Sequence, residues 1–288
     1  MKRLPYFVAL IAVVAGAPLL ADEAADAKAR LTESLTLHAS FDHGFDADFS
    51  RGDKRCLTRQ QQELVPVVVS DDLQRSTDSG RFGSGLRFPR KGSVRPQFDG
   101  KQVVNYRRDG WDTTVSLWLR LDPDRDLQPG YCDPVQIIGD DLKKGFVFLE
   151  WSKDETPRYF RYAIRPLFQI WNPKNINWAD IPFAERPMVQ VSGAPFTREH
   201  WTHVAFTVEQ VNVKGAKPSG KLFINSELQG RIENWDLTFD WNPDQVQLVL
   251  GAAYVGDLDD LAVFNRALTP LEIKQLHALP RGVSELHP

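Results

Sequence analysis

The feature that most constrains this 288-residue sequence is the alternation of apolar and polar residues in many short runs. Between 115 and 121, valine and leucine occupy every odd position, and Ser116, Trp118 and Arg120 lie between them. Successive side chains of a strand point to opposite faces of the sheet, so this alternation places one face in a core. Further apolar runs of strand length lie at 35–41, 86–88, 146–151, 204–208, 222–224, 247–250 and 261–263. Gly, Pro, Asp and Asn separate the runs, which predicts an all-β fold of two antiparallel sheets packed as a β-sandwich.

Two segments depart from this pattern. Near the C-terminus, Thr269, Pro270 and Glu272 have the order of a helix start with a capping box, so we expect one short C-terminal helix. The segment 156–195 is rich in proline and aromatic residues, and its strand signal is poor. It is predicted to be a loop-rich insertion.

The N-terminus has the features of an export signal. Lys2 and Arg3 precede an uncharged apolar stretch from 4 to 20, and Asp22 follows Ala21. This order predicts a signal peptide over 1–21 and a secreted or periplasmic protein; the alternative is an uncleaved membrane anchor. Residues 22–34 are predicted to form a leader segment, either a short helix or loose. No later segment is apolar enough to cross a bilayer, so no membrane span is expected after cleavage.

Charge and cysteine content narrow the classes of partner and site. The formal net charge is −3, and the basic footprint of a nucleic-acid binder is missing, so no nucleic-acid partner is expected. The sequence has two cysteines, Cys56 and Cys132. An even count in an exported chain permits one disulfide, and Cys56–Cys132 is the predicted pair; two separate thiols are the alternative.

Six short motifs follow one another along the chain. They are His38-Ala-Ser-Phe-Asp42, Gly80-Arg-Phe-Gly-Ser-Gly-Leu-Arg-Phe88, Val115-Ser-Leu-Trp-Leu119, Trp201-Thr-His-Val-Ala205, Gly220-Lys-Leu-Phe-Ile-Asn225 and Gly256-Asp-Leu-Asp-Asp-Leu261. In this order they resemble the strands and turns of LamG-like (concanavalin A-like) jelly rolls over about 35–279. The resemblance implies one jelly-roll domain over 35–288, in a fold that usually binds rather than catalyses. The chain departs from the family at Asn225-Ser226, where Asp-Gly is usual, and at 156–195, which has no counterpart.

The same resemblance implies a structural calcium ion. LamG-like folds often hold calcium between an aspartate of the last strand and carbonyl oxygens of the first, and calcium prefers oxygen ligands of this kind. Asp259 has the parity of Leu261 and Val263, and Asp42 ends the first strand, so Asp42 and Asp259 are the predicted ligands of Ca²⁺. The alternative is that Asp259 caps a turn by accepting backbone N–H groups.

Aromatic residues supply the candidate carbohydrate site. Four lie in or next to 156–195, with asparagines between them: Trp151, Tyr159, Trp171 and Trp178. Sugar rings pack their C–H faces on aromatic planes, so these four are the predicted carbohydrate-binding residues; the alternative is that they bury the insertion. Core packing is predicted for three residues on strands, which are Trp118, Trp201 and His203.

These observations predict an exported, non-catalytic binding module for carbohydrate or for a glycan-bearing surface. No catalytic role is expected, because the sequence has no Gly-x-Ser-x-Gly elbow, no phosphate loop and no His-Glu-x-x-His motif. Glu150 and Asp154 share strand parity, but their spacing does not match the carboxylate pattern of glycosidases with this fold. Two alternatives stay open: a structural or protein-interaction domain of the cell envelope, and a glycoside hydrolase.

Overall fold

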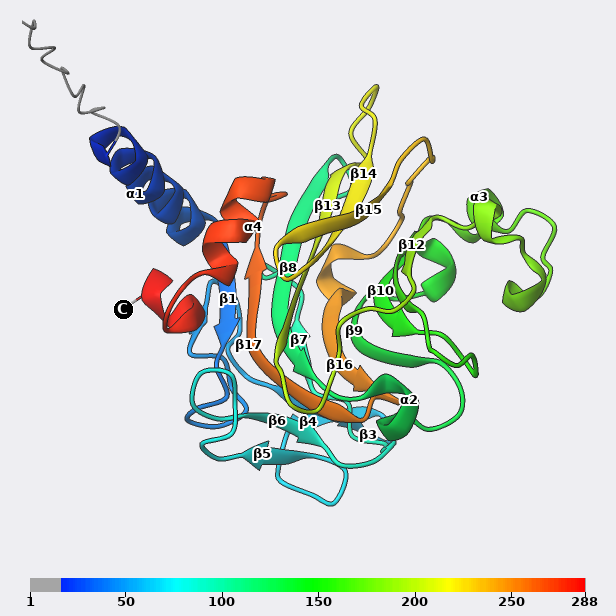
Figure 1. The fold of residues 1–288 in the computed structure, drawn as a ribbon. Coiled ribbons are helices and arrows are strands. Elements are labelled where there is room, and N and C mark those ends of the chain that lie inside the picture. Colours follow the sequence, from blue (N-terminus) through cyan, green and yellow to red (C-terminus); the bar gives the residue numbers. More distant parts are fainter. Residues whose placement is uncertain (1–16, 288) are drawn as a thin grey trace, which may run out of the picture.

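Two antiparallel sheets face each other across an apolar core in the computed structural model, which describes residues 17–287 (Figure 1). The nine-stranded sheet has the order β15–β14–β13–β8–β17–β1–β2, and β6 pairs with both β17 and β5. The eight-stranded sheet has the order β12–β11–β10–β9–β16–β7–β3–β4. The predicted β-sandwich is therefore confirmed.

The strand bounds show where the predicted runs fall. The nine-stranded sheet consists of β1 (Leu35–Ala39), β2 (Phe49–Ser50), β5 (Gln74–Ser76), β6 (Gly85–Phe88), β8 (Trp111–Arg120), β13 (Thr202–Val211), β14 (Ser219–Ile224), β15 (Glu227–Ile232) and β17 (Gly256–Phe264). The eight-stranded sheet consists of β3 (Leu57–Gln60), β4 (Glu63–Pro66), β7 (Gln97–Asp99), β9 (Cys132–Ile138), β10 (Phe146–Trp151), β11 (Phe160–Arg165), β12 (Met188–Val191) and β16 (Gln247–Ala252). Every predicted run coincides with a strand.

Helices are short and lie outside the sandwich. The α-helices are α1 (Ala17–Ser34), α2 (Pro123–Asp126), α3 (Phe168–Trp171) and α4 (Pro270–His277). The described residues also contain five short 3₁₀ helices, which are η1 (Leu142–Lys144), η2 (Trp178–Asp180), η3 (Phe183–Glu185), η4 (Pro243–Gln245) and η5 (Gly282–Leu286). The predicted C-terminal helix is confirmed, because Thr269 and Glu272 form both hydrogen bonds of the capping box at the start of α4.

The core between the sheets includes one of the predicted ligand-binding residues. Trp151 is fully buried, and its ring contacts Phe160, Phe196 and Tyr254 at centroid distances of 4.8, 5.1 and 5.7 Å. A ring enclosed in this way has no face left for a sugar. The prediction that Trp151 binds carbohydrate is therefore wrong: β10 turns this side chain inward.

A second apolar cluster lies outside the nine-stranded sheet, where α1, α4 and η5 pack together (Figure 1). Leu31 of α1 shares it with Ile273 of α4 and Val283 of η5. The leader thus folds as a helix docked on the domain. The predicted signal peptide falls largely on residues outside the described range, so it stays a prediction. None of the helices described over residues 17–287 is long and apolar enough to cross a bilayer.

The insertion at 156–195 contains more regular structure than predicted. It contributes β11 and β12, which extend the eight-stranded sheet beyond β10. The loop between them carries α3, η2 and η3. In β11 the side chains of Phe160, Tyr162 and Ile164 belong to the core and alternate with Arg161, Ala163 and Arg165, a strand pattern that the prediction for this segment overlooked.

The predicted disulfide is wrong, because Cys56 and Cys132 are both free thiols. Both side chains are buried. The Sγ atom of Cys132 lies 3.7 and 3.5 Å from the carbonyl oxygens of Gln128 and Gly130. Burial raises the pKa of the Cys132 thiol to about 11 and also raises that of Cys56. Both thiols are therefore inert at neutral pH.

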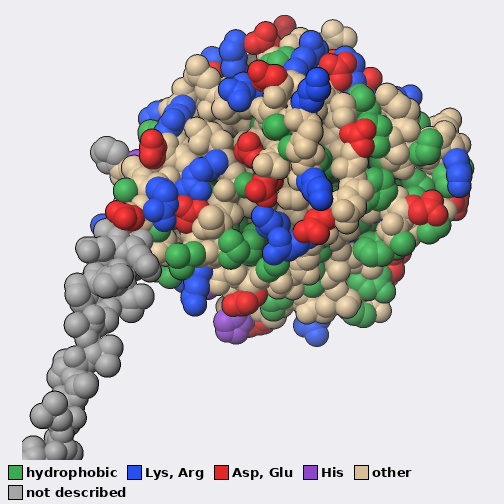
Figure 2. Space-filling view, turned by 90° about the horizontal axis from the view of Figure 1, so that it is seen from above, with side chains coloured by type: hydrophobic (Ala, Val, Ile, Leu, Met, Phe, Trp, Pro, Cys, Tyr) green, Lys and Arg blue, Asp and Glu red, His purple; other side chains and the backbone are tan. Residues whose placement is uncertain are grey.

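The surface carries both signs of charge. Figure 2 shows Lys and Arg side chains interspersed with Asp and Glu on the face seen from above. Mixing of this kind agrees with the net charge of −3 and gives that face no single-sign field that would attract a polyanion.

Candidate functional site

Two of the four predicted aromatic residues lie on the outer side of the eight-stranded sheet. Trp171 and Trp178 come together there, with ring centroids 5.5 Å apart. The guanidinium groups of Arg165 and Arg186 lie 3.7 and 4.6 Å from the Trp178 centroid. Trp178 also packs against the small apolar cluster of Phe146, Phe148, Ala163 and Met188. These contacts attach the insertion to the sheet. Packing of the insertion by its aromatic residues is the alternative to carbohydrate binding that the sequence left open.

Two rows of side chains cross the outer face of the nine-stranded sheet, on the other side of the sandwich. In the first row, Asp257 of β17 lies directly opposite Arg87 of β6 and Arg120 of β8. In the second row, Trp118 of β8 lies opposite Asp259 of β17 and His203 of β13. Cross-strand neighbours on one face are in contact distance, so strand order brings these residues together.

Trp201 precedes β13 and continues the first row. Thr202 pairs with Leu119, so Trp201 stands beside Arg120, whose guanidinium lies 4.6 Å from the Trp201 ring. Trp201 is partly exposed, unlike the fully buried Trp151. It therefore presents aromatic surface to solvent at the end of a row of charged side chains.

On one side of Trp201 lies a cavity of about 550 Å³, here called the tryptophan pocket. Its lining residues are Arg81, Trp118, Glu199, His200, Trp201, Asn225 and His277. Trp118 forms the floor: the His277 ring stacks on it at 5.3 Å, and the Arg81 guanidinium lies 4.7 Å from its centroid. The pocket thus combines aromatic planes with donors and acceptors of several kinds, the composition of small-molecule sites.

Asn225 owes its place to the turn between β14 and β15. Asn225 and Ser226 both have positive φ, 48° and 66°, as the two central residues of a tight hairpin turn do. The Asn225 side-chain oxygen accepts the backbone N–H of His203 at 3.0 Å. The departure from Asp-Gly therefore keeps the turn and adds an amide to the pocket.

The two histidines beside Trp118 are uncharged at neutral pH. Burial lowers the pKa of His203 to about 3, and its Nε2 lies 2.8 Å from Ser116 Oγ. Burial, followed by the nearby Arg81 cation, also lowers the pKa of His277. Arg81 and Glu199 supply one cation and one anion to the tryptophan pocket.

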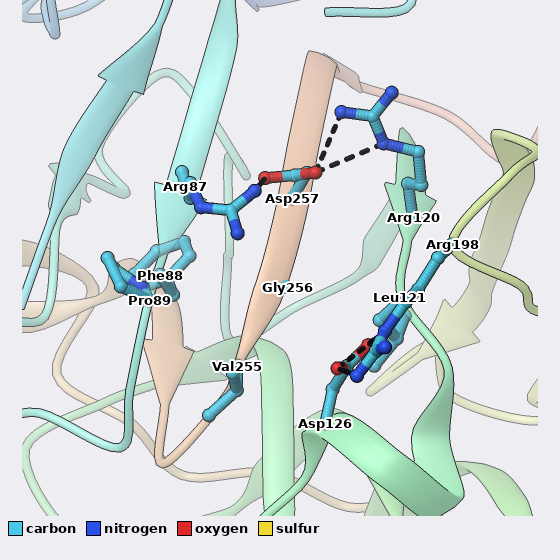
Figure 3. A pocket seen from close by; sticks show the side chains of 10 residues that line it. All are labelled: Arg87, Phe88, Pro89, Arg120, Leu121, Asp126, Arg198, Val255, Gly256 and Asp257. Atoms are coloured by element: carbon cyan, nitrogen blue, oxygen red, sulfur yellow. Dashed lines mark hydrogen bonds and ion pairs between the residues drawn. The ribbon is translucent and has the colours of Figure 1, made fainter. Parts of the chain in front are cut away.

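Beyond Arg120 lies a second cavity, of about 370 Å³, here called the arginine pocket (Figure 3). It is lined by Arg87, Phe88, Pro89, Arg120, Leu121, Asp126, Arg198, Val255, Gly256 and Asp257. The chain segment 198–201 lines both pockets, with Arg198 in this one and Trp201 in the other. The two pockets are therefore neighbours that share one wall.

The predicted calcium ligands are engaged by hydrogen-bond donors. The backbone N–H groups of Arg81 and Phe82 donate to Asp259 Oδ2 at 2.6 and 2.9 Å. Ser84 N–H donates to Asp42 Oδ1 at 2.6 Å, and Arg75 donates to the Asp42 carbonyl at 2.7 Å. Asp259 thus caps the turn that contains Arg81 and Phe82. Among the described residues no cluster of three or more His, Cys, Asp or Glu could hold a metal. The calcium site stays a prediction from the family resemblance.

A buried ionic cluster lies on the outer face of the eight-stranded sheet. Glu150 of β10 pairs with Arg161 of β11 at 3.2 Å, and Asp133 of β9 accepts a hydrogen bond from Gln136 at 2.7 Å. Burial, followed by repulsion from Glu150, raises the pKa of Asp133 to about 7. Burial also raises the pKa of Glu150. Two neighbouring acids that both resist ionisation are one of the arrangements seen at functional sites.

The raised pKa of Asp133 predicts a pH-dependent effect of Asp133→Asn. In the unfolded chain Asp133 loses its proton near pH 4, whereas in the folded chain it keeps the proton to about pH 7. The stability from this group is present below pH 4 and is lost as pH rises to 7. We therefore expect Asp133→Asn to be more stable than the wild type at pH 8, on the order of 1–3 kcal/mol, and this difference to shrink as pH falls from about 7 to below 4.

Urea unfolding of both proteins across this range measures the difference. The comparison must be with the wild type at each pH, because His203, with its lowered pKa, shifts stability in the opposite direction below pH 6.5. A difference that does not change with pH would show that Asp133 titrates normally.

Sequence reasoning missed the residues of this outer face. Trp118 and His203 are buried as expected, but they lie on the outer face of the nine-stranded sheet and not between the sheets, whereas Trp201 is partly exposed. The parity of Trp118 and Arg120 in β8 already placed them opposite the leucines. What the sequence did not reveal is that β8 and β6 flank β17, which brings Arg87 and Arg120 to Asp257.

Comparison with known proteins agrees with this architecture. The family model described as the concanavalin A-like lectin/glucanases superfamily matches residues 99–274, more than half of the chain. No curated protein sequence matches the chain.

Similar solved structures share low sequence identity with it. Domain 4 of a GH43 extracellular arabinanase from Geobacillus stearothermophilus, in complex with arabinotriose, is 18% identical, with 84% of this chain and 97% of that one covered and a TM-score of 0.46. The receptor binding domain of botulinum neurotoxin D is 13% identical, with 86% and 53% covered and a TM-score of 0.50. The serotype D ligand binding domain in complex with N-acetylneuraminic acid is 13% identical, with 87% and 52% covered and the same TM-score, 0.50. The chain spans about half the length of the two toxin domains. Fold and family model agree, and the chain belongs to the concanavalin A-like lectin/glucanases superfamily.

Proposed function

We propose that this protein is an exported, non-catalytic binding module for carbohydrate or for a glycan-bearing surface, and that it binds at the tryptophan pocket. The observation that carries the proposal is the partly exposed Trp201 ring at the wall between two cavities, with Glu199, His200 and Asn225 around it. A sugar ring can pack on the indole while amide, imidazole and carboxylate groups bond its hydroxyls. Export rests on the N-terminal sequence alone.

The fold is compatible with this role. A neurotoxin domain with the same fold was solved with N-acetylneuraminic acid. At 13% identity this likeness shows the fold alone, so the binding residues are argued from this chain. Its outer sheet face supplies, at one place, aromatic surface, an amide and both signs of charge.

The test is a glycan array followed by calorimetric titration of the best ligand. Trp201→Ala should weaken binding about tenfold or more, as expected for the truncation of a central aromatic contact. Trp171→Ala is the matched control, because Trp171 is also a partly exposed tryptophan but lies in α3 of the insertion, between two strands of the other sheet. Loss of binding in Trp171→Ala with none in Trp201→Ala would move the site to the insertion. A folded protein that binds no glycan would overturn the proposal and leave the structural or protein-interaction role.

A glycoside hydrolase is the second candidate, favoured by the acids Asp133 and Glu150 on adjacent strands. Glycoside hydrolysis requires two carboxyl groups that flank the scissile bond. Against it, the two residues are only 8% and 4% exposed, and Glu150 is paired with Arg161. Release of reducing sugar from a bound glycan, abolished in Asp133→Asn, would establish catalysis and overturn the non-catalytic assignment.

A further inference from the structure

The arginine pocket brings three guanidinium groups to one cavity (Figure 3). Arg87 comes from β6, Arg120 from the end of β8, and Arg198 from the segment before β13. Two carboxylates, Asp257 and Asp126, lie among them. An arginine-rich cavity is a common way to recognise carboxylate, sulfate or phosphate groups, because the planar guanidinium donates paired hydrogen bonds.

The charges in this cavity do not cancel. Asp257 is shared: Arg120 donates to its Oδ2 through Nε and Nη2 at 3.0 and 2.8 Å, and Arg87 donates to its Oδ1 at 3.3 Å. Arg198 and Asp126 form a separate two-pronged pair. One carboxylate therefore opposes two guanidinium groups on the β6–β17–β8 row, and the lining residues carry one net positive charge.

Donors remain available to a ligand. Within the described chain, the side chain of Arg87 makes a single hydrogen bond, the one to Asp257, and it is 53% exposed. The side chain of Arg198 is 52% exposed, and only its Nε and Nη2 are bonded to Asp126 within residues 17–287. Unused N–H groups at exposed guanidinium edges can bond an anion without breaking the pairs already formed.

The cavity adjoins the tryptophan pocket. Arg120 lies against one side of Trp201, and the segment 198–201 lines both cavities. The remaining wall of the arginine pocket is apolar and is formed by Phe88, Pro89, Leu121 and Val255. A charged substituent in this cavity would therefore lie next to a sugar ring that packs on the indole.

We propose that the arginine pocket binds the anionic group, a carboxylate or a sulfate ester, of an acidic saccharide whose neighbouring ring occupies the tryptophan pocket. This inference rests on the proposed carbohydrate-binding function and names the ligand class. Arg87 and Arg198 supply the free donors, and Arg120 links the charged group to Trp201. Asp257 holds Arg87 and Arg120 in position.

The experiment uses an array in which each uronate, sialylated or sulfated glycan stands beside its methyl ester or desulfated counterpart. Acidic members should bind more tightly than their neutral counterparts. Arg87→Gln and Arg198→Gln should each weaken binding of the acidic member about tenfold, the effect of losing one charge-assisted contact, and leave the neutral member unchanged. The uronate and sulfate arms separate the two sources of negative charge.

Arg231→Gln is the control for net charge. Arg231 lies on β15 with a side chain 45% exposed, away from both cavities, and its loss should change nothing. Equal binding of acidic and neutral members would overturn the inference and leave the proposed function standing. A preference for acidic members that survives both arginine substitutions would place the anion elsewhere and also overturn it. If the folded protein binds no member of the array, the proposed function fails and the inference fails with it.

Discussion

Replacement of Trp151 by alanine is expected to lower the free energy of unfolding by about 3–5 kcal/mol. The side chain is fully buried, so the truncation removes its contacts with Phe160, Phe196 and Tyr254 and leaves a cavity between the sheets. Equilibrium unfolding in urea measures the loss. The size of the effect follows from close packing, because neighbouring side chains can refill only part of the space.

Trp171→Ala is the comparison for this substitution. Trp171 is partly exposed and covers part of the insertion, so its loss should reduce stability by less than the loss of Trp151. Trp151→Phe keeps most of the volume and should recover much of the stability. If Trp151→Ala and Trp171→Ala destabilise equally, Trp151 is not in the core.

The second large effect is expected for Arg161→Met. Arg161 and Glu150 are both buried, with side chains 6% and 5% exposed, and their ion pair is 3.2 Å long. Removal of the cation leaves a buried carboxylate without this partner, and losses of this kind are about 3–5 kcal/mol. Arg161 also donates to Gln190 at 2.7 Å, a bond between β11 and β12 that is lost as well.

Two further measurements isolate the charge effect. The loss should be smaller at pH 5 than at pH 8, because burial already raises the pKa of Glu150 and a protonated carboxyl needs no cation. The double substitution Glu150→Gln with Arg161→Met should recover part of the stability. A double variant as unstable as Arg161→Met would attribute the loss to packing rather than to charge.

The sandwich was predictable because one face of most strands is apolar and the other is polar. In β8 the core receives Val115, Leu117 and Leu119, and this alternation alone identifies the strand. The helix α4 was equally clear, because its capping box is local in sequence. Local signals of this kind do not depend on which strands become neighbours.

The site was harder to predict because it depends on strand order. Arg87, Arg120 and Asp257 are far apart in sequence, and only the β6–β17–β8 order places them in one row. Two tryptophans differ from their predictions. Trp151 was predicted to bind carbohydrate and lies in the core, whereas Trp201 was predicted to lie in the core and stands at the wall between two pockets. Proximity of aromatic residues in sequence was thus a poor guide to proximity in space.

The docking of α1 has a consequence for the minimal folding unit and for ligand affinity. A chain that began at Leu35 would lose Leu31 from the outer cluster and uncover Ile273 and Val283, leaving an apolar patch prone to association. The same helix α4 that contributes Ile273 to this cluster ends at His277, which stacks on Trp118. Attachment of α1 and occupancy of the tryptophan pocket therefore share one structural element, and linkage requires that any effect of α1 on ligand affinity be matched by an equal effect of the ligand on α1 docking.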